Sequence, residues 1–102
     1  MSNKIIALHD YATRLGLTAE DLLGKSRKPI LSTARQAYWR YMQSIGCGYS
    51  EIARKFNRDS ATIRCGIQRV DDLLYTSDEV AFMCATELFR KDENNFSEKV
   101  ER

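Results

Sequence analysis

Apolar side chains recur every three or four residues along most of the chain, which is the spacing of amphipathic helices. The first predicted helix covers about residues 3–15 and ends before Gly16, and a second, short helix runs from its cap Thr18 to Gly24. The expected apolar face of the first helix consists of Ile5, Leu8, Ala12 and Leu15. No segment alternates long enough to predict a strand.

Four further helices are predicted after Pro29. Their expected bounds, in chain order, are about Ile30 or Ser32 to Ile45, 51–56 with Ser50 as its cap, Asp59 or Ser60 to about Leu74, and about 78–90. The expected core residues of the last two are Ile63, Ile67, Val70 and Leu74, then Val80, Met83, Cys84 and Leu88. Trp39 is also expected in the core rather than as a stacking platform on the surface.

A chain of 102 residues supports one hydrophobic core. The predicted fold class is therefore all-α: a compact bundle of about five to six helices in a single domain over residues 1–91. The polar tail, residues 92–102, is expected to be disordered.

Residues that commonly carry catalysis or bind metals are sparse. Cys47, Cys65 and Cys84 are widely spaced, and His9 is the one histidine. We therefore predict no catalytic residues, no metal, no cofactor and no disulfide, in a cytoplasmic protein with reduced thiols. No apolar run is long enough to cross a membrane, so no membrane partner is expected.

Charge is unevenly distributed along the chain, although the net charge is only +2. Residues 25–69 contain ten basic and two acidic side chains, a formal charge of +8, whereas residues 1–24 carry −1 and residues 70–102 carry −5. A basic segment of this size is typical of a nucleic-acid-binding surface, although the same charges can also cover a solvated face.

Within the basic segment, residues 50–74 are predicted to form a helix-turn-helix. Asn57 readily takes the left-handed conformation of a tight turn, and Ile52, Phe56 and Ile63 are placed to pack inside the bend. In DNA-binding proteins built in this way, the second helix enters the major groove with its first residues near the base edges.

The candidate DNA contacts near the start of the second helix are Arg58, Asp59, Ser60, Ala61, Thr62 and Arg64. Arginine reaches phosphate or guanine, hydroxyls donate to phosphates or bases, and an alanine methyl can contact thymine. The free N–H groups of a helix start also favour phosphate. Asp59 has two interpretations: a helix cap, which we favour, or a base reader that accepts from cytosine.

Several short motifs, in the same order, resemble the C-terminal DNA-binding domain of the bacterial chromosomal replication initiator DnaA. They lie within about residues 5–75 and are Leu22–Pro29, Ala34–Gln36, Ser50–Phe56, Arg58–Asp59 and Thr62–Ile63. The resemblance implies a Trp-repressor-like, all-helical fold whose recognition helix reads the major groove. It also implies that Lys25, Arg27 and Lys28 contact the DNA backbone and that Arg35 contacts the adjacent minor groove.

The chain departs from the family pattern in the turn and in the recognition helix. One turn residue is missing before Arg58, Ser60 stands where the family has a base-contacting His, and Ala61 replaces Ser or Thr. The chain also lacks a phosphate-binding loop and has no room for an ATPase domain. The expected function is double-stranded DNA binding by an initiator-like accessory or regulatory protein of the nucleoid. The alternative is a protein-interaction or homodimerisation module that uses the C-terminal helix.

Overall fold

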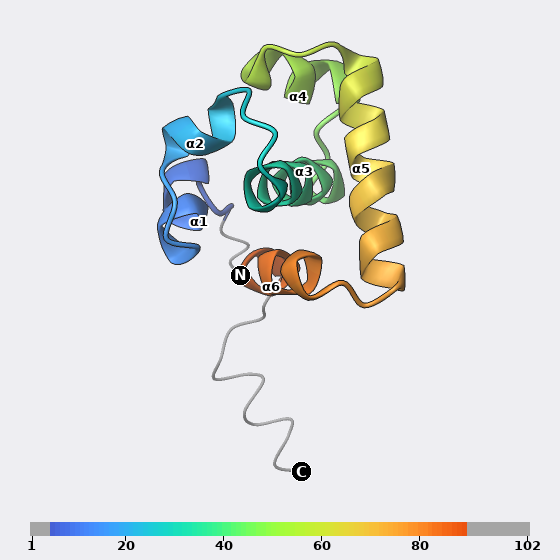
Figure 1. The fold of residues 1–102 in the computed structure, drawn as a ribbon. Coiled ribbons are helices and arrows are strands. Elements are labelled where there is room, and N and C mark those ends of the chain that lie inside the picture. The colour runs from blue at the N-terminus through green and yellow to red at the C-terminus, as the bar shows by residue number, and fades with distance from the viewer. Residues whose placement is uncertain (1–4, 90–102) are drawn as a thin grey trace.

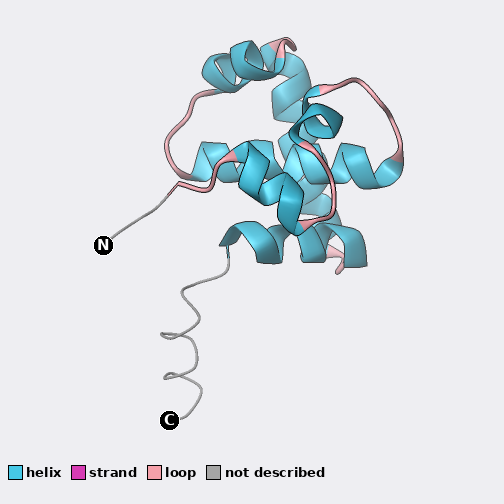
Figure 2. Cartoon of the chain, turned by 90° about the vertical axis from the view of Figure 1, so that its left-hand side faces the viewer, coloured by secondary structure: helices cyan, strands magenta, loops and turns pink. Residues whose placement is uncertain are grey.

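The computed structural model describes residues 5–89, which form six helices and no strand (Figures 1 and 2). The helices are α1 Leu8–Arg14, α2 Ala19–Leu23, α3 Pro29–Ser44, α4 Tyr49–Phe56, α5 Ser60–Tyr75 and α6 Glu79–Phe89. The prediction of an all-α bundle of about five to six helices is confirmed for these residues. The predicted disordered tail, 92–102, lies outside the described residues.

Helix α3 lies in the centre of the bundle, and the other helices surround it (Figure 1). Pro29 occupies the first turn of α3, where a missing N–H costs nothing because that group has no partner within the helix. Helix α3 contacts α2, α4, α5 and α6. Trp39 is only 2% exposed, which confirms its prediction as a core residue.

Aromatic side chains from three helices form much of the core. The ring of Tyr38 stacks on Tyr11, and Trp39 meets Phe56 edge to face. Burial raises the pKa of Tyr11 above its usual range and the pKa of Tyr38 to about 12, so both hydroxyls stay protonated and donate. The Tyr11 hydroxyl donates to the Ala34 carbonyl, which ties α1 to α3 inside the core.

The first helix begins at Leu8, later than predicted, and Ala7 just before it is extended. The backbone N–H of Ile6 donates to the Tyr41 hydroxyl at 2.8 Å, and its carbonyl accepts from the Tyr38 hydroxyl at 2.7 Å. Because α3 satisfies both polar groups of Ile6, a helical turn is not needed there. Ile5, expected on the buried face, is 69% exposed.

One other helix start and one apolar face also differ from prediction. Helix α4 begins at Tyr49 with Gly48 as its cap, and the Gly48 N–H donates to the Glu51 carboxylate at 3.4 Å, so Ser50 is not the cap. The buried face of α6 includes Ala81 besides the predicted Cys84 and Leu88. Met83 is 44% exposed because it lies on the opposite side of that helix.

Candidate functional site

Helices α4 and α5 meet at a three-residue turn, residues 57–59. Asn57 takes the predicted left-handed conformation, with φ 56° and ψ 50°. The Arg58 N–H donates to the Ala53 carbonyl at 2.9 Å, which closes the end of α4. Ile52, Phe56 and Ile63 are buried inside the bend, as their spacing predicts. The two helices are therefore held at a defined angle by a shared apolar contact.

Asp59 caps α5. Its carboxylate accepts from the Thr62 N–H at 2.9 Å. Hydrogen bonds from the Thr62 side chain and backbone hold the pKa of this carboxyl below its usual value, because they stabilise the ionised form. The favoured interpretation of Asp59 as a cap is confirmed, and its role as a base reader stays a prediction.

The predicted contacts at the start of α5 lie at the surface. Ser60, Ala61, Thr62 and Arg64 are all exposed. The Arg64 guanidinium lies 5.9 Å from the ring centre of Tyr49, which places it on the α4 side of α5. Four exposed side chains therefore follow one another along the first turns of this helix.

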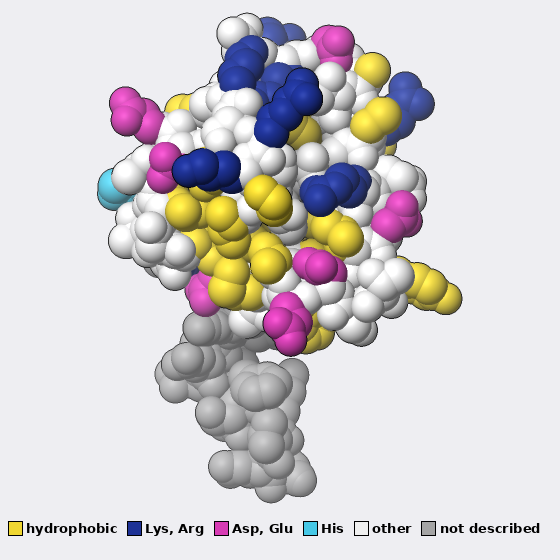
Figure 3. Space-filling model, viewed as in Figure 1, with side chains coloured by type: hydrophobic (Ala, Val, Ile, Leu, Met, Phe, Trp, Pro, Cys, Tyr) yellow, Lys and Arg dark blue, Asp and Glu magenta, His cyan; other side chains and the backbone are white. Residues whose placement is uncertain are grey.

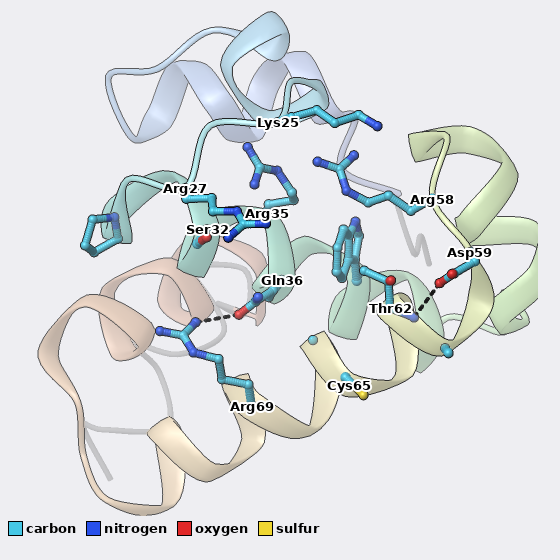
Figure 4. Close-up of a pocket in the computed structure, with 14 residues that line it drawn as sticks. Lys25, Arg27, Ser32, Arg35, Gln36, Arg58, Asp59, Thr62, Cys65 and Arg69 are labelled. Atoms are coloured by element: carbon cyan, nitrogen blue, oxygen red, sulfur yellow. Dashed lines mark hydrogen bonds between the residues drawn. The ribbon is translucent and has the colours of Figure 1, made fainter.

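A groove of about 770 Å³ lies between the basic loop (residues 25–29), the first half of α3 and the first half of α5 (Figure 4). We call it the basic groove, because five of its lining side chains are cationic and one is acidic. The lining residues are Lys25, Arg27, Pro29, Ser32, Arg35, Gln36, Trp39, Arg58, Asp59, Ala61, Thr62, Cys65, Gly66 and Arg69.

Arg35, for which the resemblance implied a minor-groove contact, is buried, with 5% of its surface exposed; that contact stays a prediction. Its guanidinium donates to the carbonyls of Leu22 at 2.8 Å, Ser26 at 3.1 Å and Asp21 at 3.1 Å. These three bonds join the end of α2 and the basic loop to α3. Burial, and then the nearby charge of Arg58, lower the pKa of Arg35.

Arg58 also contributes to holding the loop in place. It donates to the carbonyls of Phe56 at 2.7 Å and Gly24 at 2.6 Å, and its guanidinium carbon lies 5.7 Å from the ring centre of Trp39. Partial burial lowers the pKa of Arg58. Arg58 therefore links the turn before α5 to the residue that precedes the basic loop.

The other predicted basic residues, Lys25, Arg27 and Lys28, are exposed, and the first two line the groove. Arg69, which sequence reasoning did not single out, lies on the opposite wall and donates to the Gln36 side chain at 2.6 Å (Figure 4). Arg69 and Cys65 follow Ala61 at intervals of four residues. That helical spacing is the signal that could have placed them on the same face.

Gly66 and Trp39 set the separation of α5 from α3. A Cβ atom on Gly66 would lie 2.5 Å from the Cζ3 atom of Trp39, so no larger residue fits without movement. Among the described residues, the Trp39 indole nitrogen is the one buried side-chain polar atom that lacks a hydrogen-bond partner.

The surface is polarised by charge. On the face in Figure 3, Lys and Arg side chains lie in the upper half, whereas Asp and Glu side chains lie mainly at the sides and in the lower half. Residues 70–89 contain five carboxylates and neither lysine nor arginine. On this face, the cationic side chains and most of the carboxylates are therefore separated.

Comparisons with known proteins add no functional evidence. No protein-family model, curated protein or solved structure matches this chain. Within residues 5–89, no helix is long and apolar enough to cross a membrane, and no group of three or more potential metal ligands comes together. Function is therefore inferred from the geometry and charge of the site.

Proposed function

We propose that this chain binds double-stranded DNA, with α4 and α5 as a helix-turn-helix and the start of α5 in the major groove. The observation that carries the proposal is the continuity of the exposed first turns of α5 with the basic loop across the basic groove. An exposed helix start beside a row of exposed cations provides both base contacts and phosphate contacts.

In this proposal, the basic residues have two different roles. Lys25, Arg27 and Lys28 are exposed and available to neutralise phosphates. Arg35 and Arg58 act as positioning residues, because their guanidinium groups already hold the loop against α2 and the turn. In this proposal, the arginine predicted for the minor groove shapes the surface instead of entering DNA.

The residues that contact the bases in this proposal are Ser60, Ala61, Thr62 and Arg64. An exposed alanine and two hydroxyl side chains allow close approach to base edges, and Arg64 reaches either guanine or phosphate. Asp59 keeps the cap, which orients the N–H groups of the helix start. Together with the resemblance to the initiator domain, this arrangement supports an accessory or regulatory role on the nucleoid.

Salt-dependent binding to a duplex tests the proposal. The logarithm of the binding constant should fall linearly with the logarithm of salt concentration, with a slope of about 0.9 for each phosphate neutralised. Lys25→Ala and Arg27→Ala should each lower that slope by about 1. Arg40→Ala, which removes a cation that pairs with Asp71, is the matched control and should leave the slope unchanged. Absence of duplex binding at low salt would refute the proposal.

A second candidate function is protein association through α6. Phe82 and Phe89 are 61% and 44% exposed and lie seven residues apart, on one side of the helix. Light scattering should then report a dimer that Phe82→Ser converts to a monomer. A wild-type monomer at all accessible concentrations would remove homodimerisation.

A further inference from the structure

Arg35 and Arg58, which we call the arginine pair, lie next to one another below Lys25 at the inner end of the basic groove (Figure 4). A guanidinium carries five N–H groups. Arg35 uses three hydrogen bonds and Arg58 two, so two and three N–H groups respectively have no acceptor within the described residues. All the acceptors in use are backbone carbonyls, which carry no full charge.

Among the residues that the structure describes, neither arginine has a carboxylate partner. The one ion pair among residues 5–89 joins Arg40 to Asp71, on another part of the molecule. Buried charges are generally paired with an opposite charge, and here a buried guanidinium stands beside a second one of the same sign. Within the described part of the chain, the charge of the arginine pair therefore has no ion-pair partner, and Asp59 is the one carboxylate that lines the groove.

The neighbouring indole shows the same lack of acceptors. Trp39 is 2% exposed, its nitrogen has no partner among the described residues, and its ring lies beside Arg58. An indole N–H is only a hydrogen-bond donor, and the surrounding guanidinium and ammonium groups are also only donors. The missing component of this cluster is an acceptor with negative charge.

The size and charge of the groove favour a small free anion. A duplex carries its phosphates on a wide, stiff backbone, which reaches exposed residues such as Lys25 and Arg27 but not a side chain that is 5% exposed. The volume of about 770 Å³ is within the usual range for small-molecule sites. Five lining cations against one carboxylate suit a ligand that carries several negative charges.

From these observations we infer that the inner end of the basic groove binds a small phosphorylated ligand of the diphosphate class. Its phosphate oxygens would accept from the arginine pair and the Trp39 N–H, and Lys25 and Arg27 would bind the outer phosphate. This inference goes beyond DNA binding, because the ligand is free and reaches groups that a duplex does not.

Pyrophosphate, added at constant ionic strength, is the test ligand. Trp39 is the one tryptophan of the chain, so its indole N–H gives a single signal in a ¹H–¹⁵N spectrum. That signal should move on titration and saturate, and calorimetry should give one pyrophosphate per chain. An indole signal that does not move, or one that moves without saturating, overturns the inference.

Two variants with the same charge change separate a built site from general attraction. Lys25→Ala should weaken pyrophosphate binding about tenfold, because it removes a charge-assisted hydrogen bond. Arg54→Ala removes an exposed cation from α4, outside the groove lining, and should change affinity less than about twofold. Equal losses in both variants would overturn the inference. The dispersed spectrum of each variant verifies its fold.

A duplex DNA titration distinguishes the source of the phosphate. The free-ligand inference predicts that a duplex leaves the indole signal in place at concentrations where pyrophosphate moves it. A duplex that moves the signal as pyrophosphate does would identify backbone phosphate as the occupant and overturn the inference, while leaving the proposed DNA binding intact. A chain that binds pyrophosphate but no duplex would refute only the proposed function.

Discussion

At the scale of single residues, position along the chain was easier to predict than the role of the side chain. Arg35 and Arg58 were both predicted as DNA contacts, and both line the basic groove. Their hydrogen-bond partners, however, lie 9 to 34 residues away for all bonds except that from Arg58 to Phe56. The pattern of charges along the sequence does not predict which distant carbonyls accept these hydrogen bonds. Trp39 was predictable as core, but its contact with Gly66 was not, because it depends on how closely α3 and α5 approach.

Replacing Arg35 is expected to destabilise the fold. Arg35→Ala leaves three backbone carbonyls without their donor, and the free energy of unfolding should fall by about 2–3 kcal/mol. Urea denaturation measures the change. Arg54→Ala, at an exposed position, should stay within about 0.5 kcal/mol of the parent chain. Similar values for the two variants would contradict a structural role for Arg35.

Gly66→Ala tests the close approach of two helices. Alanine normally stabilises a helix relative to glycine, but here the added methyl would lie 2.5 and 2.7 Å from ring atoms of Trp39. We expect a loss of about 1–3 kcal/mol in the free energy of unfolding, which chemical denaturation would detect. Cys65→Ala, one residue earlier and exposed, is the matched control. A Gly66→Ala chain as stable as its parent would show that α5 can move away at no cost.

At the scale of helices and turns, capping residues in the sequence predicted the starts of two helices correctly. Thr18 caps α2, with its hydroxyl accepting from the Asp21 N–H at 3.1 Å, and Asp59 caps α5, both as predicted. One error arose where a distant group replaced the local signal. The start of α1 shifted because the hydroxyls of Tyr38 and Tyr41 bind the backbone of Ile6. The buried face of α6 was only partly predicted, because apolar residues lie on more than one side of this helix.

The cap on α5 makes stability depend on pH. Because hydrogen bonds from Thr62 lower the pKa of Asp59 in the folded state, its contribution is present above the pKa of an unfolded aspartate and is lost as the pH falls through the lower, folded value. Asp59→Asn keeps a capping oxygen but does not titrate. The melting temperatures of the two chains should therefore converge as the pH falls from about 5 to 2. A difference that stays constant over this range would contradict the ionised cap.

At the scale of the whole molecule, the fold converts a sequence block into a charged end. Residues 25–69 were predicted as a basic surface from the +8 charge, and the structure brings part of that segment together around one groove. The groove itself was not predictable, because its walls come from the basic loop, α3 and α5, which a helical pattern does not place relative to one another. DNA binding stays a proposal that rests on this surface.

Salt should have opposite effects on folding and on binding. The like charges of residues 25–69 repel one another in the free protein, and salt screens this repulsion. Salt removes little attraction, because Arg40–Asp71 is the one ion pair among residues 5–89. Raising sodium chloride from about 20 to 200 mM should therefore raise the melting temperature by a few degrees while it weakens duplex binding. Calorimetric scans without DNA measure the first effect. A melting temperature that falls with salt would contradict self-repulsion.

The bond from Arg58 to the Gly24 carbonyl has a consequence for the entropy of association. It fixes the start of the basic loop to the turn before α5, and Arg35 fixes the loop again at Ser26. The basic loop and the start of α5 are therefore already positioned before a ligand binds. Little conformational entropy of the chain remains to be lost on binding. A ligand that spans loop and helix meets a preorganised receptor, and loosening either arginine would weaken binding mainly through a less favourable entropy.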